Sequence, residues 1–229
     1  MKTNSEAILR QVVETLEEEI VLGVLHPRER LVEDELLARF GLKRHVVRQA
    51  LMDLERMGLV ERKRNIGAIV KAYTAEEVEQ LYAVRELLET HCVGMIRLPV
   101  APGRLLALEA VQREHDEAVT QNDLRRVFRV NVRFHQMLFG FSENPVLVAA
   151  IQDHAQRAHS IRASTLDMPK QLENARSEHW QIIEALRAVD REQLMALCRR
   201  HLTPSRDAYI EAYRRRLSSP SMYAATASG

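Results

Sequence analysis

Apolar residues recur at the spacing of an α-helix along most of this chain. In residues 5–22 they occupy every fourth position, at Ile8, Val12, Leu16 and Ile20. A stripe of this period predicts an amphipathic helix with one buried face. Two shorter helices are predicted at 33–40 and 44–57, because Gly41 and Gly58 follow them where glycine commonly ends a helix.

The pattern changes between residues 59 and 70. Two short runs of β-prone residues, at 59–61 and 68–70, enclose a basic stretch that contains a glycine. This arrangement predicts a small β-hairpin with a basic tip. Beyond Lys71 the helical period returns, and we therefore place a domain boundary near residues 71–74.

The second part of the chain is predicted to be wholly helical. Thr74, followed three residues later by Glu77, forms a capping box at its start. Helices are expected at residues 74–98, 103–121, 124–141, 145–166, 170–189 and 191–216. The predicted fold class is therefore mainly α. Three helices and a hairpin occupy residues 1–72, an all-helical antiparallel bundle occupies 73–217, and 218–229 is expected to be a disordered tail.

Composition narrows the class of protein without changing this outline. The chain has 229 residues, of which 46% are hydrophobic and 28% charged, as in a soluble globular protein. Cys92 and Cys198 lie far apart among helical apolar residues, which indicates buried thiols in a reducing compartment. The sequence shows no signal peptide and no apolar run of membrane-spanning length, so we expect a cytoplasmic protein without a membrane partner.

Charge is distributed unevenly along the chain. The formal net charge is only +1, but residues 43–64 contain seven basic residues and three acidic ones. A local basic excess of this kind is typical of a surface that faces phosphate groups. The alternative is a solvated charged face with no partner.

The two short helices fit a helix-turn-helix, and the hairpin fits its wing. In that motif the first residues of the second helix contact base edges in the major groove. Here these residues are Lys43, Arg44, His45 and Arg48. Arg44 and Arg48 share one helix face, and arginine suits bidentate contact with guanine. Lys63 and Arg64, at the hairpin tip, are expected to contact DNA phosphates.

One continuous segment combines the glycines, the basic residues and the apolar residues described above at fixed distances from one another: GVLHPRERLVEDELLARFGLKRHVVRQALMDLERMGLVERKRNIGAIV. Through it, residues 5–72 resemble the N-terminal domain of the GntR superfamily of bacterial regulators. The chain departs from that family's usual residues at Arg28, Lys43, His45 and Val46. The resemblance implies a winged helix-turn-helix that binds double-stranded DNA. We expect a homodimer on a near-palindromic operator.

In the second part, four polar residues fall on otherwise apolar helix stripes. Asn131 and His135 are four residues apart and share one face, while His179 and His201 lie on stripes of two later helices. Three imidazoles and an amide oxygen from three helices suit Zn²⁺ or another first-row divalent ion, such as Ni²⁺ or Mn²⁺. The alternative is that each histidine is satisfied within the core.

Arg85 is a further polar residue on an inward-facing stripe. A buried guanidinium needs an anionic partner. Glu89, four residues later, can supply one. A more specific hypothesis is that Arg85 binds the carboxylate of a ligand beside the metal.

The segments YAVRELLE, NVRFH, SENP, SEHWQIIEAL and RRHL contain these residues. Through them, residues 74–215 resemble the FCD-type ligand-binding domain of the FadR subfamily of GntR regulators. The resemblance implies that Asn131, His135, His179 and His201 ligate a divalent metal, and that a small carboxylate effector completes its shell. The family's usual first ligand is aspartate. Asn131 brings no charge, which should favour an anionic effector more strongly.

The other histidines and two further arginines lie outside these motifs. We expect the isolated histidines, His26, His91, His115 and His159, to be surface or incidental groups. One of three basic residues, His154, Arg157 or Arg162, is expected to reach the ligand pocket.

The function predicted from these features is that of a ligand-responsive transcription regulator, more often a repressor, and not an enzyme. A metal-dependent hydrolase is the competing hypothesis. The sequence offers no convincing general base for such an enzyme. Glu178 is expected to lie on a different helix face from His179, and Glu89 is expected to pair with Arg85. A third hypothesis is a regulator whose bundle is purely structural.

Overall fold

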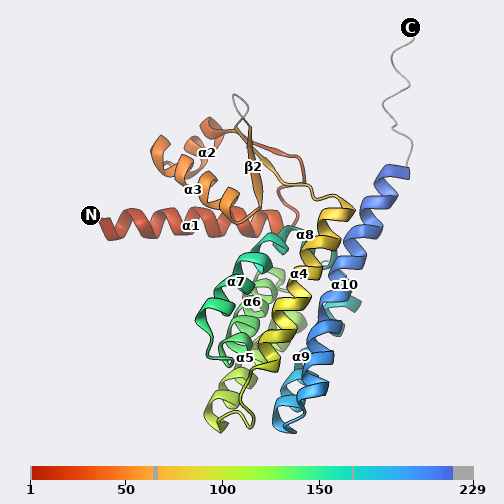
Figure 1. The fold of residues 1–229 in the computed structure, drawn as a ribbon. Coiled ribbons are helices and arrows are strands. Elements are labelled where there is room, and N and C mark those ends of the chain that lie inside the picture. Colours follow the sequence, from red (N-terminus) through yellow and green to blue (C-terminus); the bar gives the residue numbers. More distant parts are fainter. Residues whose placement is uncertain (1, 64–66, 167, 219–229) are drawn as a thin grey trace.

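Helices dominate the structure (Figure 1), and the predicted fold class is confirmed. The computed structural model describes residues 2–63, 67–166 and 168–218. The elements of the N-terminal unit are α1 (Lys2–Val21), β1 (Arg30–Leu31), α2 (Glu33–Phe40), α3 (Arg44–Arg56), β2 (Val60–Lys63) and β3 (Gly67–Val70). Those of the bundle are α4 (Ala75–Gly94), α5 (Pro102–Thr120), α6 (Leu124–Gly140), α7 (Pro145–Arg157), α8 (His159–Leu166), α9 (Pro169–Arg187) and α10 (Arg191–Ser218). The predicted tail, from residue 219 onward, lies outside the described residues.

The sheet of the N-terminal unit has three strands, in the order β1-β3-β2. β3 pairs antiparallel with β2, as the predicted hairpin requires, and also with β1, where Leu31 lies opposite Ala68. The sequence predicts only the hairpin, because β1 has two residues and so short a strand shows no alternating pattern.

The core of the N-terminal unit lies where α1 and α3 pack together and against the sheet. Leu16, Leu51 and Leu54 are fully buried there, and each contributes roughly 1.5–3 kcal/mol through its burial. Gly41 follows α2 with a φ of 64°, a left-handed conformation that glycine adopts without strain. The chain therefore turns sharply, and α3 starts only three residues later at Arg44.

The bundle begins with the predicted capping box. The Glu77 backbone N–H donates to the Thr74 hydroxyl at 3.1 Å, and the Thr74 N–H donates to the Glu77 carboxylate at 2.8 Å. α4 then runs antiparallel beside α10 along the length of the bundle (Figure 1). Phe134, Leu138 and Ile182 are buried at the centre of the main apolar core.

The single helix predicted at 145–166 is wrong, since the chain breaks at Ala158 into α7 and α8. α7 packs mainly on α4, whereas α8 packs on α10 and on α1. Ala158 and Ile161 are fully buried against the cluster that contains α10 residues. Apolar residues recur at helical spacing on both sides of Ala158. The end of α7 at this point is therefore set by tertiary packing rather than by the local sequence.

The N-terminal unit is in direct contact with the bundle, and α1 lies across one end of it (Figure 1). The Tyr73 hydroxyl donates to the Gly58 carbonyl at 2.8 Å. Gly58 has a φ of +75°, and a Cβ at this position would lie 2.8 Å from Cγ of Arg157. Glycine is therefore required here both for the turn and for the approach of α7.

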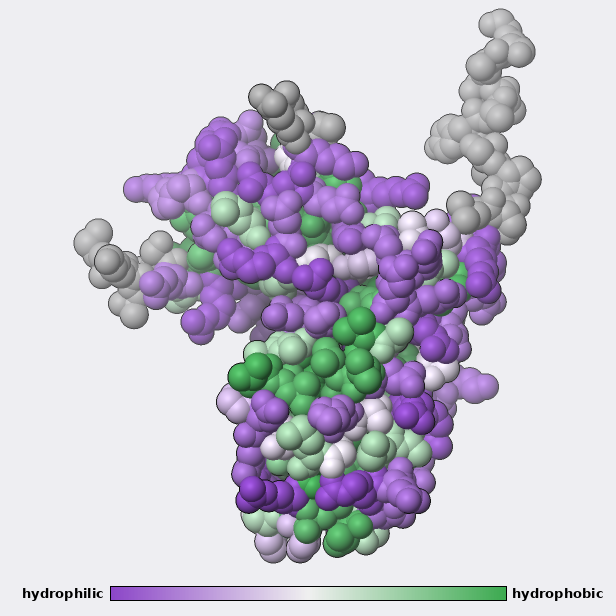
Figure 2. Space-filling model, in the orientation of Figure 1, coloured by the Kyte–Doolittle hydropathy of each residue, from purple (hydrophilic) through white to green (hydrophobic). Residues whose placement is uncertain are grey.

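Polar side chains cover most of the N-terminal unit in Figure 2, while apolar side chains gather on the bundle face below it. Within the described ranges, every helix falls short of the length or the apolar character needed to cross a bilayer.

Candidate functional site

The residues predicted to read DNA lie together on the exposed side of α3. Lys43 precedes the helix, and Arg44, His45 and Arg48 follow on its first turns, all exposed to solvent. The opposite face is buried in the unit's core, as Val47 illustrates at 1% exposure. The amphipathic pattern thus orients the helix as predicted.

Acidic residues of α2 hold the two arginines in the structure. The Arg44 guanidinium lies 2.7 Å from Asp34, and Arg48 Nε lies 3.0 Å from Glu33. The arginine side chains remain 53% and 55% exposed, so these are surface pairs worth about 0–1 kcal/mol. Such pairs orient the guanidinium groups and can be exchanged for phosphate or base contacts at low cost.

The hairpin carries the other predicted DNA contacts, Lys63 and Arg64. Lys63 ends β2 and is exposed, as predicted. Arg64 lies outside the described residues.

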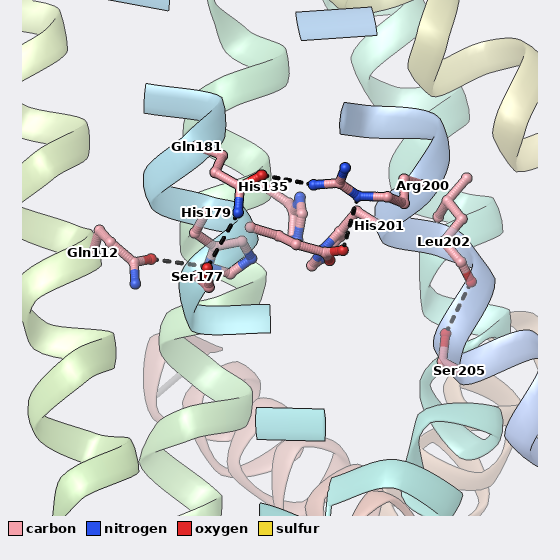
Figure 3. Close-up of polar contacts among 10 residues, drawn as sticks. Gln112, His135, Ser177, His179, Gln181, Arg200, His201, Leu202 and Ser205 are labelled. Atoms are coloured by element: carbon pink, nitrogen blue, oxygen red, sulfur yellow. Dashed lines mark hydrogen bonds and ion pairs between the residues drawn. The ribbon is translucent and has the colours of Figure 1, made fainter. Parts of the chain in front are cut away.

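Three of the four predicted metal ligands converge in the bundle. His135 of α6, His179 of α9 and His201 of α10 each place a ring nitrogen within 4.8 Å of the others. Nε2 of His135 lies 3.1 Å from Nε2 of His201. Figure 3 shows the imidazoles directed toward one another between the three helices. We call these residues the histidine triad.

Hydrogen bonds from outside the triad orient two of its rings. Nδ1 of His179 contacts Oε1 of Gln112 at 2.8 Å, and Nδ1 of His201 contacts Oε2 of Glu178 at 2.8 Å (Figure 3). An acceptor on Nδ1 fixes the tautomer in which Nε2 keeps its lone pair, which is the usual support for a metal-binding histidine. The expectation that Glu178 points away is therefore wrong, because α10 packs beside α9 and brings His201 to it.

The protonation states also suit a cation site. Burial, together with the neighbouring imidazoles, lowers the pKa of His135 and His179 well below that of a free histidine. Both rings are therefore neutral near pH 7 and can donate a lone pair. Nε2 of His179 is buried without a hydrogen-bond partner. These donors fit a divalent first-row metal.

Two cavities adjoin the triad. The large cavity, of about 310 Å³, is lined by residues that include Arg85, Glu89, His135, Arg162 and three glutamates of α1. The small cavity, of about 80 Å³, is lined by residues that include His115, Asn131, Gln171, Glu178 and His201. Asn131, one helical turn before His135 on α6, thus lines the same small cavity as His201. Of the three basic residues considered for the pocket, Arg162 lines both cavities.

Arg85 has one of the two partners considered for it, Glu89. It is 2% exposed, and its Nε and Nη2 atoms each lie 2.9 Å from Oε1 of Glu89. Its Nη1 atom is buried without a partner at the wall of the large cavity. The ion pair explains how the buried guanidinium is tolerated, and it leaves the Nη1 group without a protein partner.

Two of the histidines expected to be surface or incidental groups are buried, so the surface assignment is wrong for them. His115 of α5 is 1% exposed, and its ring lies 5.1 Å from that of His179. Burial lowers the pKa of His115 to about 4. The burial of His115 could have been predicted from the sequence, because it follows Val111 by four residues and so lies on the same helix face. His159 is 5% exposed and donates from Nδ1 to Glu17 of α1 at 2.7 Å.

The large cavity is closed on one side by the N-terminal unit. Glu14, Glu17 and Glu18 of α1 line it. Glu18 pairs with Arg125 at 3.0 Å and with Arg129, both on α6. The first helix of the unit that carries α3 is therefore part of the cavity wall.

Comparison with family models divides the chain in the same way. The model of the bacterial regulatory proteins of the gntR family matches residues 8–70, and the FCD domain model matches residues 80–204. The chain is 27% identical over 183 residues to the HTH-type transcriptional regulator YdhC of Bacillus subtilis (strain 168), across 80% of this chain and 82% of that protein. It is 21% identical over 198 residues to the HTH-type transcriptional repressor RspR of Escherichia coli (strain K12), across 86% and 87%.

Solved structures share the fold. McbR/YncC of Escherichia coli aligns with a TM-score of 0.73 at 21% identity, over 92% of this chain and 98% of that one. A GntR transcriptional regulator from Rhodococcus sp. RHA1 aligns with a TM-score of 0.76 at 23% identity, over 90% and 99%. The arrangement of a helix-turn-helix unit ahead of a helical bundle is thus common to these proteins.

Proposed function

Since this chain belongs to the GntR family of bacterial regulatory proteins and carries an FCD domain, we propose that it is a cytoplasmic repressor released from DNA by a small carboxylate. The observation that carries this proposal is the convergence of three imidazole nitrogens beside a cavity whose wall holds an unpartnered arginine N–H. The cation site and the arginine together suit an anion.

The DNA-reading part of the proposal rests on α3. The exposed residues at its start can contact base edges: Lys43, Arg44, His45 and Arg48. Lys63 can contact a DNA phosphate. One such helix reads a half-site of a few base pairs. A homodimer would present two of them to a near-palindromic operator.

The metal part of the proposal assigns the three Nε2 atoms of the histidine triad and the Asn131 amide oxygen as ligands of Zn²⁺, with Ni²⁺ and Mn²⁺ as alternatives. Such an ion, when bound, would polarise and position a carboxylate oxygen of the effector. Gln112 and Glu178 hold the rings of His179 and His201 in place from outside.

The effector part of the proposal uses the large cavity. Arg85 is pre-positioned by Glu89 and presents Nη1 to the cavity. A charge-assisted hydrogen bond to this group would fix one end of an acid. Glutamates of α1 line the same cavity, so an acid bound there can act directly on the N-terminal unit. For this to change DNA binding, the acid must bind the DNA-binding and the DNA-free conformations with different affinities.

A purely structural bundle is disfavoured by its hydrogen bonds. Seven buried side-chain polar atoms of the described residues lack a partner, and five of these belong to the triad or line its cavities. Each costs about 1–3 kcal/mol if nothing satisfies it. Histidines kept only for packing would not leave so many groups unpaired in one place.

A metal-dependent hydrolase is disfavoured by the state of Glu178, the carboxylate that touches the triad. Burial opposes its ionisation, but hydrogen bonds from His201 and Arg200 hold the pKa of Glu178 below its usual value. A general base must accept a proton readily, so this group is better suited to orienting His201.

The test is to purify the full-length chain without chelator and to measure its metal content, its binding to a selected operator and its thermal shift with carboxylates. We expect one metal per chain, and release of DNA by an acid that stabilises the protein. His179→Ala should lose metal and acid response but keep operator binding. The matched control, His91→Ala, changes an exposed histidine and should keep all three. Metal-free wild-type protein without any response to acids would refute the sensing proposal.

A further inference from the structure

The function proposed above gives no role to the acidic residues that begin α2. Glu33, Asp34 and Glu35 form its first turn, and the structure pairs two of them with Arg44 and Arg48 of α3. Acidic side chains beside a surface that faces DNA phosphates weaken binding through repulsion. All three share one general role, because carboxylates in a first turn stabilise a helix through its dipole. Their contacts with the arginines distinguish them.

Glu33 bridges the two arginines. Its Oε1 and Oε2 atoms lie 3.2 and 3.0 Å from Nε of Arg48, and Oε2 lies 3.4 Å from Nη1 of Arg44. The side chain of Glu33 is only 22% exposed, whereas those of Arg44 and Arg48 are 53% and 55% exposed. The carboxylate therefore lies largely within the protein surface, while both arginine side chains extend to solvent.

The contact between Glu33 and Arg48 uses a nitrogen that base reading does not need. A bidentate contact with guanine requires two parallel N–H groups, which the two terminal nitrogens of arginine supply. Among the described residues, Glu33 holds Arg48 through Nε. Arg48 can therefore keep this ion pair while Nη1 and Nη2 contact a base. DNA that covers the pair would reduce its screening by solvent and salt, and so strengthen it.

Asp34 contacts the opposite kind of atom. Its Oδ1 lies 2.7 Å from Nη2 of Arg44, a terminal nitrogen, and its side chain is 74% exposed. Arg44 must leave Asp34 before both of its terminal nitrogens can contact guanine. This ion pair therefore competes with base reading instead of supporting it.

We propose that Glu33 is a positioning residue for base reading by Arg48, whereas Asp34 is a competitor that weakens base reading by Arg44. A side chain that is already held loses less conformational freedom when it meets its base. Phosphate contacts position a protein on any sequence, and they do not require one fixed guanidinium orientation. Glu33 should therefore favour the operator over other DNA. This inference rests on the proposed reading of bases by α3.

The experiment compares three variants of one helical turn, Glu33→Ala, Asp34→Ala and Glu35→Ala, by fluorescence anisotropy on the full-length protein. The probes are an operator that the wild-type protein selects from random duplexes and a scrambled duplex of the same composition. Glu33→Ala should weaken operator binding about three- to tenfold, the scale of ordering one long side chain, without weakening binding to the scrambled duplex. Asp34→Ala should tighten operator binding about two- to fivefold, the scale of one surface ion pair. Glu35→Ala, the matched control, removes the same charge from an exposed residue and should change both affinities by the same factor.

A second comparison tests whether Glu33 acts through Arg48. In an Arg48→Ala background, Glu33→Ala should reduce operator affinity less than about twofold, because the partner is already absent. An equal loss in both backgrounds would overturn the positioning role. Equal losses on the operator and on the scrambled duplex would also overturn it, since they indicate a disturbed α2. Weaker operator binding by Asp34→Ala would overturn the competitor role.

Failure of this inference is distinguishable from failure of the proposed base reading. If Arg44→Ala and Arg48→Ala both keep wild-type specificity, base reading by α3 fails, and the role of Glu33 fails with it. If the arginine variants lose specificity but Glu33→Ala keeps it, only the positioning role fails.

Discussion

Nδ1 of His159 lies 2.7 Å from Oε1 of Glu17, and this contact joins the bundle to the first helix of the N-terminal unit. Both residues line the large cavity. Glu17 belongs to the helix against which α3 packs, whereas His159 begins α8. The pair therefore lies between the proposed effector and the proposed DNA-reading helix.

The first prediction concerns this contact. Glu17→Ala should reduce the factor by which the effector changes operator affinity by about tenfold, because coupling between sites of this kind is typically about 1–3 kcal/mol. Fluorescence anisotropy with labelled operator, with and without the acid, measures that factor. Glu6→Ala, an exposed glutamate on the same helix, should leave it unchanged. An unaltered response in Glu17→Ala would exclude the contact from the coupling.

A second prediction concerns Asn131, the uncharged residue proposed as a metal ligand. Asn131→Asp adds a negative oxygen donor, which favours Mn²⁺ more than Zn²⁺, since hard ions gain most from carboxylates. We expect Mn²⁺ affinity to rise at least about tenfold, the scale of one metal-supporting interaction. Competition with a chromophoric chelator measures both affinities. Asn174→Asp places the same charge on another residue of the small cavity and should have a smaller effect. Equal effects at the two positions would indicate that Asn131 is not a ligand.

The third prediction concerns pH. The pKa of His115 is about 4 in the folded chain because of burial, against 6.5 as its ordinary value. Between these values the unfolded chain binds a proton that the folded chain excludes, so the free energy of unfolding falls as pH drops from about 7 to about 4. The full contribution is about 3 kcal/mol at about 1.4 kcal/mol per pKa unit.

Urea denaturation of the metal-free protein across that pH range measures this effect. His115→Leu should flatten the pH dependence relative to wild type, whereas His91→Leu, an exposed histidine, should not. Titrating carboxylates contribute equally to all three proteins, so the difference between curves reports His115 together with its effect on the neighbouring His135 and His179. Parallel curves for wild type and His115→Leu would contradict the assignment.

A fourth prediction concerns base reading by α3. Arg44→Ala and Arg48→Ala should each weaken specific operator binding by about 1–3 kcal/mol, because each would remove a proposed bidentate base contact. Arg56→Ala, at the far end of the same helix and paired with Asp53, should change it little. Competition between operator and random DNA measures specificity. Wild-type specificity in both Arg44→Ala and Arg48→Ala would mean that another element reads the bases.

Much of this structure follows from local pattern alone. The stripe that contains Leu16 predicts α1, the glycine at position 41 predicts the end of α2, and Thr74 with Glu77 predicts the start of α4. The sequence also identifies His135, His179 and His201 as inward-facing polar residues, because each lies on an apolar stripe of its helix. Periodicity along one helix identifies its buried face, since burial repeats with the turn of the helix.

Only the tertiary structure decided which buried faces meet. It brings Glu178 to His201, His115 to His179 and Glu17 to His159, and in each pair the two residues belong to different helices. It also divides α7 from α8 at Ala158, where packing on α10 and α1 outweighs continuous helical period. A sequence pattern records how each residue relates to its own helix axis. The partner across an interface depends on how separate helices cross, and no local periodicity contains that information.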